Sequence, residues 1–195
     1  MMLLAFVDTH GDMNSLKRLK KKAAKADLVL CAGDLTIFEN HMRAILHEVN
    51  SFDKPVLLIH GNHETEHRLK AECEHHKNLI CLHRDFYEKD NIVFAGYGGG
   101  GFSMRDEKFE KFADRIRNKR IGKQLVMLFH APPHGNRTDV IMGDHAGNKS
   151  YRDFIREEKP LLVICGHLHE NEGEQDKLGK TIIINPGPDG KLIEL

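Results

Sequence analysis

Short runs of apolar residues recur along the whole chain, and most of them are rich in residues that favour strands. Each run is bounded by polar residues, glycine or proline, which is the pattern expected of buried strands. The sequence therefore predicts eight strands, at residues 3–7, 27–32, 55–59, 91–97, 124–129, 161–165, 181–185 and 191–195.

Apolar residues at helical spacing occupy three of the stretches between these runs, at residues 16–26, 42–49 and 109–116. Asn14 and Ser15 precede the first of these stretches and are candidate N-caps. The alternation of strand and helix predicts a largely parallel first half. The later strands follow one another with less helix between them, which predicts a more antiparallel second half.

Length and composition limit how the chain is organised. The chain has 195 residues, of which 40% are hydrophobic and 30% charged, and we expect one globular domain that spans residues 1–195. No run approaches the roughly 20 apolar residues needed to cross a bilayer, and the first residues lack the basic flank of a signal peptide. We therefore expect a cytoplasmic protein without a membrane partner.

Five of the predicted strands end in side chains that can bind a metal ion. Taken singly, each of these residues has an ordinary role as a turn residue, a helix N-cap or a core histidine. Their joint occurrence predicts a ligand site, because the carboxyl ends of strands in open α/β sheets converge on one crevice. Glycine before three of them lets the backbone approach a ligand closely. The residues are Asp8, His10, Asp34, Asn62, His63, His130, His167 and His169.

The spacing and number of these groups indicate which ions they suit. Asp8 with His10, and His167 with His169, are two residues apart, so that each pair can point the same way. Without His63, two Asp, one Asn and four His are too many for one tetrahedral zinc and suit two divalent cations about 3.5–4 Å apart. Mixed imidazole, carboxylate and amide ligands favour Mn²⁺, Fe, Zn²⁺, Co²⁺ or Ni²⁺ over Mg²⁺ and Ca²⁺, and Mn²⁺ is our first expectation.

The blocks DTH, GD, GNHE, a single histidine after a strand, and GHLH occur in that order between Asp8 and Pro186. In this order they resemble the calcineurin-like metallophosphoesterases. The resemblance implies an α/β fold, an α+β sandwich in which two mixed β-sheets flanked by helices form four αββα layers. It implies a first cation held by Asp8, His10 and His169, a second held by Asn62, His130 and His167, and a bridge between them made by Asp34.

The same resemblance implies that His63 contacts the substrate phosphate and protonates the leaving group. Glu64 either orients this imidazole or caps a helix on the solvent side. The loop at residues 131–149 either lines the substrate side or is a solvated loop. Its candidate residues for substrate are His134, Arg137, Asp139, His145 and Asn148.

Our hypothesis is an enzyme that hydrolyses small phosphodiesters, including cyclic nucleotides, and aryl phosphates. A hydroxide activated by two cations would attack, with Asp34 and His63 as catalytic residues. Two alternatives remain open, a nuclease acting on DNA or RNA ends and a non-catalytic metal-binding scaffold. Lys+Arg and Asp+Glu both number 29, which disfavours nucleic acid as a partner, and the complete ligand set disfavours the scaffold. We also expect a homodimer.

Overall fold

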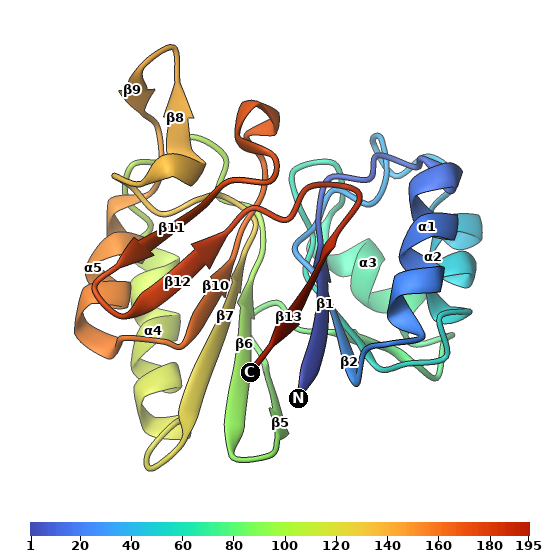
Figure 1. Ribbon diagram of the computed structural model, residues 1–195, viewed down its shortest axis with the longest axis horizontal. Helices are drawn as coiled ribbons and strands as arrows, with labels where there is room; N and C mark the ends of the chain where they lie inside the picture. The colour runs from blue at the N-terminus through green and yellow to red at the C-terminus, as the bar shows by residue number, and fades with distance from the viewer.

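Two β-sheets face each other in the computed structural model, which describes residues 1–195 (Figure 1). In spatial order, the strands of the first sheet are β13 (Lys191–Glu194), β1 (Met2–Phe6), β2 (Leu28–Cys31), β3 (Val56–Leu58) and β4 (Leu79–Cys81). Those of the second sheet are β11 (Gln175–Leu178), β12 (Thr181–Ile184), β10 (Leu162–Ile164), β7 (Gln124–Phe129), β6 (Ile92–Tyr97) and β5 (Phe86–Lys89).

Helices cover the outer face of each sheet (Figure 1). The first sheet is covered by α1 (Met13–Ala23), α2 (Met42–Asn50) and α3 (Glu66–Cys73), and the second by α4 (Glu107–Lys119) and α5 (Lys149–Glu158). The short hairpin of β8 (Val140–Ile141) and β9 (Asp144–His145) projects from the molecule, and two 3₁₀ turns are η1 (Arg137–Asp139) and η2 (His169–Asn171). The four αββα layers confirm the predicted fold class.

Three hydrophobic clusters fill the spaces between the layers. They contain 19, 17 and 16 buried residues, and the third lies between the two sheets. Along β1 the side chains alternate, so that Leu3 and Ala5 face the other sheet while Leu4 and Phe6 face the helices. Because both faces of the central strands are buried, these strands read in the sequence as uninterrupted apolar runs.

All eight predicted strands and all three predicted helices are present. Helices α3 and α5 were not predicted, nor were the short strands β4, β5, β8, β9 and β11, several of which are half-exposed. The N-cap prediction for α1 is wrong. Asp12 caps this helix, because its carboxylate accepts hydrogen bonds from the Asn14 amide and the Ser15 hydroxyl, both at 2.8 Å.

The expectation of a more antiparallel second half is confirmed, because β1 to β4 pair with one another only in parallel and every antiparallel pair involves a later strand. At the centre of the second sheet, however, strands β6, β7, β10 and β12 run parallel, and antiparallel pairs occur only with the edge strands β5, β11 and β13 and in the β8–β9 hairpin. Helix α4 connects β6 to β7, and α5, which the sequence pattern did not reveal, lies between β7 and β10. These crossovers let the second sheet keep the parallel order of the first.

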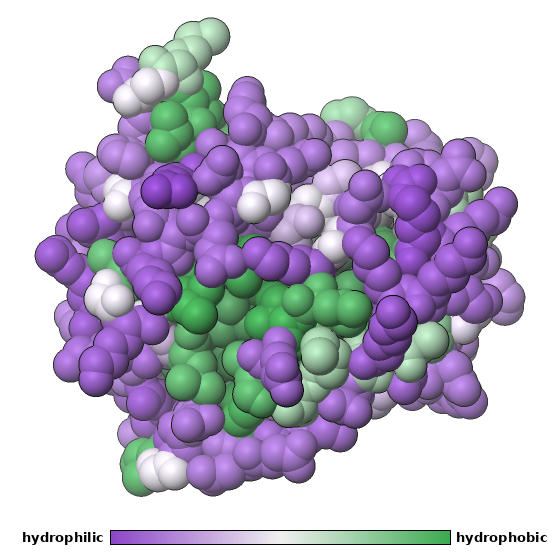
Figure 2. Space-filling view, viewed as in Figure 1, coloured by the Kyte–Doolittle hydropathy of each residue, from purple (hydrophilic) through white to green (hydrophobic).

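Polar residues cover most of the face seen in Figure 2, but an apolar area crosses it where β12 and β13 lie in Figure 1. A cavity of about 550 Å³ beside these strands is lined by Met1, Leu161, Ile182 and Leu195, among others. The inter-sheet core therefore reaches the surface there. No helix of the structure combines the length and the apolar character needed to cross a membrane.

Candidate metal centre

The ligand residues predicted from the sequence lie close together, at the carboxyl ends of strands from both sheets. Each sheet contributes part of the set, so the site lies where the loops of the two sheets meet. From the first sheet come Asp8 and His10 after β1, Asp34 after β2, and Asn62 after β3. From the second sheet come His130 after β7 and His167 and His169 after β10.

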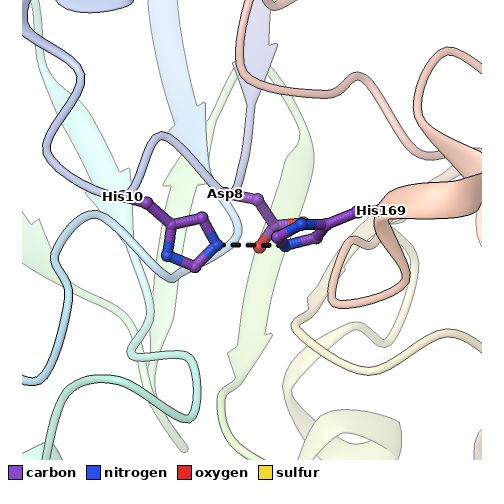
Figure 3. A group of neighbouring side chains, drawn as sticks. All are labelled: Asp8, His10 and His169. Carbon is purple, nitrogen blue, oxygen red and sulfur yellow. Dashed lines mark hydrogen bonds between the residues drawn. The ribbon is translucent and has the colours of Figure 1, made fainter.

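Asp8, His10 and His169 form one group, with ligand atoms all within 4.8 Å of one another (Figure 3). The Nε2 atoms of His10 and His169 lie 3.0 Å apart. The Nδ1 atom of His10 lies 3.3 Å from the Thr36 carbonyl oxygen, so a proton on Nδ1 leaves Nε2 with a free lone pair. Two facing imidazole nitrogens at this distance need a proton or a cation between them.

Asn62, His130 and His167 form a second group. The Oδ1 atom of Asn62 lies 3.0 Å from His130 Nε2 and 2.8 Å from His167 Nδ1. The other ring nitrogen of His130 lies 2.9 Å from the Ala32 carbonyl oxygen, which fixes the orientation of the imidazole. One amide oxygen and two imidazoles therefore converge, in the combination that the resemblance implies for a second cation.

Asp34 lies between these two groups. Its carboxylate is within 4.8 Å of ligand atoms of Asp8 and His130, and also of His10 and His63. Its Oδ1 accepts a hydrogen bond from the His63 amide at 2.9 Å, and its Oδ2 lies 3.4 Å from His130 Nε2. A carboxylate so placed is within reach of ions in both groups.

Burial and neighbouring charges shift the pKa values of this centre. Burial raises the pKa of Asp8 to about 6. Burial also acts to raise the pKa of Asp34, but the hydrogen bond and charge of His130 outweigh it and lower the pKa to about 2. Burial, together with the charge of His130, lowers the pKa of His167 to about 4. His167 is therefore neutral at pH 7, the form that binds cations.

Two buried polar atoms of the centre have no hydrogen-bond partner in the protein, Asp8 Oδ1 and His167 Nε2. Such atoms are rare in folded proteins and call for a bound group. Asp8 and Asp34 are only 3% and 2% exposed, and no lysine or arginine forms an ion pair with either. The unpartnered atoms and the mixed donor set both fit divalent cations.

The glycines before Asp34, Asn62 and His167 allow the close approach expected from the sequence. A Cβ on Gly61 would collide with the Asp34 carboxylate, and one on Gly166 would lie 2.8 Å from Asp8 Oδ2. Gly33 has a φ of +102°, and its Cβ would lie 2.6 Å from the Gly61 amide nitrogen. The groups that come close are thus a ligating carboxylate at Gly61, the Val7 side chain and Asp8 at Gly166, and the Gly61 backbone and the His130 ring at Gly33.

Four of the seven ligand residues adopt left-handed backbone conformations. Their φ values are +55° at Asp8, +44° at His10, +50° at Asp34 and +70° at His167. Residues other than glycine adopt such conformations rarely, at a cost of about 1–3 kcal/mol each, and they concentrate at functional sites. Nothing in the sequence pattern indicated these conformations.

His63 lies at the edge of the centre and is half-buried. Its ring packs against those of His10 and Phe38, with centroids 4.9 Å and 4.5 Å away. The Phe38 amide donates to Nδ1 of His63 at 3.3 Å. In the neutral imidazole this hydrogen bond places the ring proton on Nε2.

Both interpretations of Glu64 are wrong, because its side chain neither contacts His63 nor faces solvent. Glu64 is 5% exposed and accepts hydrogen bonds from the amides of Asp34, Thr36 and Gly61 at 3.1, 2.8 and 3.0 Å. It also accepts one from the Thr36 hydroxyl at 2.8 Å. Glu64 therefore ties the loop after β2 to the loop after β3, and so positions Asp34 through its backbone.

The loop at residues 131–149 is held by its own buried polar groups. Asp139 is fully buried and accepts hydrogen bonds from the amides of Gly135, Asn136 and Gly147 and from His145 Nδ1, at 2.8–3.0 Å. Asn148 is 1% exposed and caps α5. A role for Asp139 and Asn148 in lining the substrate side is therefore wrong, because both are used to fold the loop.

A second cluster of similar residues consists of His60 after β3, Glu66 at the start of α3 and His83 after β4. Here Arg84 contacts both carboxylate oxygens of Glu66, at 2.8 and 2.7 Å. The Gly98 amide donates to His83 Nδ1 at 2.8 Å, so the proton of the neutral ring is on Nε2, 3.5 Å from Glu66. The hydrogen-bonding groups and the charge of this second cluster are therefore paired within the protein itself.

Comparison with known proteins agrees with this geometry. A family model described as calcineurin-like phosphoesterase matches residues 1–171. An uncharacterized protein of Methanocaldococcus jannaschii is 30% identical, over 96% of this chain and 88% of its own length. A probable glycerophosphodiester phosphodiesterase of Arcobacter nitrofigilis is 24% identical over 84% of this chain, which spans only 64% of that relative. A crystal structure of a Thermus thermophilus protein superposes with a TM-score of 0.80, over 96% of this chain and 90% of the other, at 18% identity.

Proposed function

Because this chain belongs to the calcineurin-like phosphoesterase family, we propose that it hydrolyses small phosphodiesters and aryl phosphates at a centre that holds two divalent cations. The observation that carries the proposal is the pair of ligand groups that share Asp34. Cyclic nucleotides belong to the proposed substrate range. A relative described as a probable glycerophosphodiester phosphodiesterase supports the choice of diesters.

Each ligand residue has a place in this proposal. Asp8, His10 and His169 would hold one cation, Asn62, His130 and His167 the other, and Asp34 both. Bound divalent cations supply positive charge to phosphoryl oxygens and lower the pKa of a coordinated water. The imidazole-rich set favours Mn²⁺, with Fe, Zn²⁺, Co²⁺ and Ni²⁺ as the other candidates.

His63 is the proposed proton donor to the leaving oxygen. The Phe38 amide occupies its Nδ1, so Nε2 carries the proton of the neutral ring. The half-buried position leaves the imidazole accessible to a substrate. General acid catalysis by a positioned imidazole contributes about 10²–10⁴-fold to a rate.

The centre is open to the surface on one side. Asn62 and His169 are exposed, whereas Asp8, Asp34 and His130 lie at the buried floor. The phosphate group of a substrate can therefore reach the ligand residues from the surface. The proposal does not depend on the homodimer, which stays a prediction.

The test is metal analysis of protein purified without chelator, followed by assays on monoesters and diesters with each candidate metal. We expect two cations per chain and hydrolysis of at least one class of small ester. Full activity with one cation per chain would contradict the two-cation centre. A metal-loaded protein that is inert on every ester would favour the scaffold, and salt-sensitive cleavage of DNA or RNA alone would favour the nuclease.

A further inference from the structure

A cavity of about 510 Å³ adjoins the candidate metal centre, between the loop after β1 and the start of α2. His10 lines this cavity as well as the metal centre. Most of the remaining lining is apolar and comes from Met13, Ile37, Ala44 and Ile45. The cavity is within the 300–1,000 Å³ range of small-molecule sites, which are typically apolar with a few polar groups.

The apolar lining of this cavity is partly uncovered. Met13 is 40% exposed and Ile37 47% exposed, whereas Ile45 is buried at 3% and forms part of the floor. Phe38, next to Ile37, is 73% exposed. Apolar surface gathered beside a polar site is a common sign of a binding region.

His63 does not line the cavity, but its ring contacts His10, which does, and Phe38, which follows the lining residue Ile37. In the proposed reaction His63 protonates the leaving oxygen. The group attached to that oxygen therefore leaves next to His10, which contacts His63 and lines the cavity.

We propose that this cavity binds the leaving group of the ester and selects esters whose leaving group is an apolar or aromatic ring. The inference rests on the proposed function and adds the part of the substrate that the metal centre does not contact. Asn40 and His41 also line the cavity. Together with His10, their side chains are the polar groups available to the edge of such a ring.

The first test narrows the cavity and compares two substrates. Ala44→Phe places a ring inside the lining, and Ala24→Phe is the matched control. Ala24 is also exposed, at the C-terminal end of α1, roughly 16 Å along the helix from Met13. The substrates carry the same phosphoryl group with either a phenyl or a glyceryl leaving group.

We expect Ala44→Phe to lower kcat/KM for the phenyl ester by about tenfold or more, mainly through KM. The glyceryl ester should change by less than about twofold, and Ala24→Phe should change neither substrate. Comparing each variant with the wild type removes the different intrinsic reactivity of the two esters. An equal loss for both esters, or no loss for either, would overturn the proposal.

A second test measures binding without catalysis, using phenylphosphonate and methylphosphonate with the metal-loaded protein in calorimetry. The wild type should bind phenylphosphonate at least about fivefold more tightly, and Ala44→Phe should abolish this preference. If the protein hydrolyses no ester but still prefers phenylphosphonate, the proposed function fails and the assignment of the cavity is supported. If it hydrolyses esters and shows no preference, only the cavity assignment fails.

Discussion

The candidate metal centre and the second cluster of His60, Glu66 and His83 contain the same kinds of side chain, both near the ends of strands. In the second cluster Arg84 neutralises Glu66, and the backbone satisfies His83. In the metal centre Asp8 Oδ1 and His167 Nε2 are buried without partners, and no lysine or arginine pairs with Asp8 or Asp34. Unsatisfied binding capacity, rather than composition, distinguishes a candidate cation site from a structural cluster.

The largest effect should come from removing the shared carboxylate. The Asp34→Ala variant should lose most of its bound metal, and its kcat should fall by more than about 10³-fold, because both ligand groups lose the carboxylate that they share. The matched variant Glu66→Ala removes the carboxylate of the second cluster and should keep both metal content and turnover. Metal analysis measures the metal content, and steady-state kinetics measure the turnover. Near-normal turnover in Asp34→Ala would remove the shared role of Asp34.

His63→Ala should lower kcat by about 10²–10³-fold while the metal content stays unchanged. The loss should be smaller for an ester with a nitrophenol leaving group, because that group departs without a proton. His83→Ala is the control in the second cluster and should leave kcat unchanged. If metal is lost together with activity in His63→Ala, His63 is a structural or ligand residue instead.

Glu64→Gln tests positioning of Asp34 through the backbone. One oxygen that accepts from backbone amides becomes an NH₂ group that repels them, so we expect metal affinity to fall by about 10–100-fold. Saturating metal should restore most of kcat, and the free energy of unfolding should fall by about 1–3 kcal/mol. Glu72→Gln, which alters the pair between Glu72 of α3 and Arg43 of α2, should leave metal affinity unchanged. An unchanged metal affinity in Glu64→Gln would show that the loops hold without this carboxylate.

The smallest effect should appear in the pH dependence of stability. Burial lowers the pKa of His83 to about 4, below the usual 6.5, so the folded state binds fewer protons than the unfolded state between these values. This group therefore destabilises the fold progressively as pH falls from 6.5 to about 4. In metal-free protein, the Tm of His83→Gln should fall less than the Tm of the wild type between pH 6.5 and 4, by about a few degrees. Parallel Tm curves for the two proteins would exclude the effect.

The sequence predicted best the parts that are buried on both sides. Strands such as β1 and β7 stand out because both faces pack against other layers. Edge strands such as β5 and β11 have mixed half-exposed patterns and were missed. Asp12 was missed as the cap of α1, because its position between a left-handed glycine and Met13 is settled only by the turn after β1.

For the candidate site, the order of the motifs predicted which residues meet, since each motif follows a strand whose end points to the same edge. The sequence did not predict how they are held. The role of Glu64 depends on amides of three residues from two loops, which only the folded chain brings together. The burial of Asp139 likewise depends on the hairpin that closes around it.

The left-handed conformations at Asp8, His10, Asp34 and His167 restrict what can be engineered there. A randomised library at these positions is filtered first by the backbone, which tolerates glycine, asparagine and aspartate and penalises β-branched residues whatever their metal chemistry. Attempts to change the preferred ion should therefore begin at Asn62, His130 and His169, whose φ values are negative and which accept a wider choice of side chains.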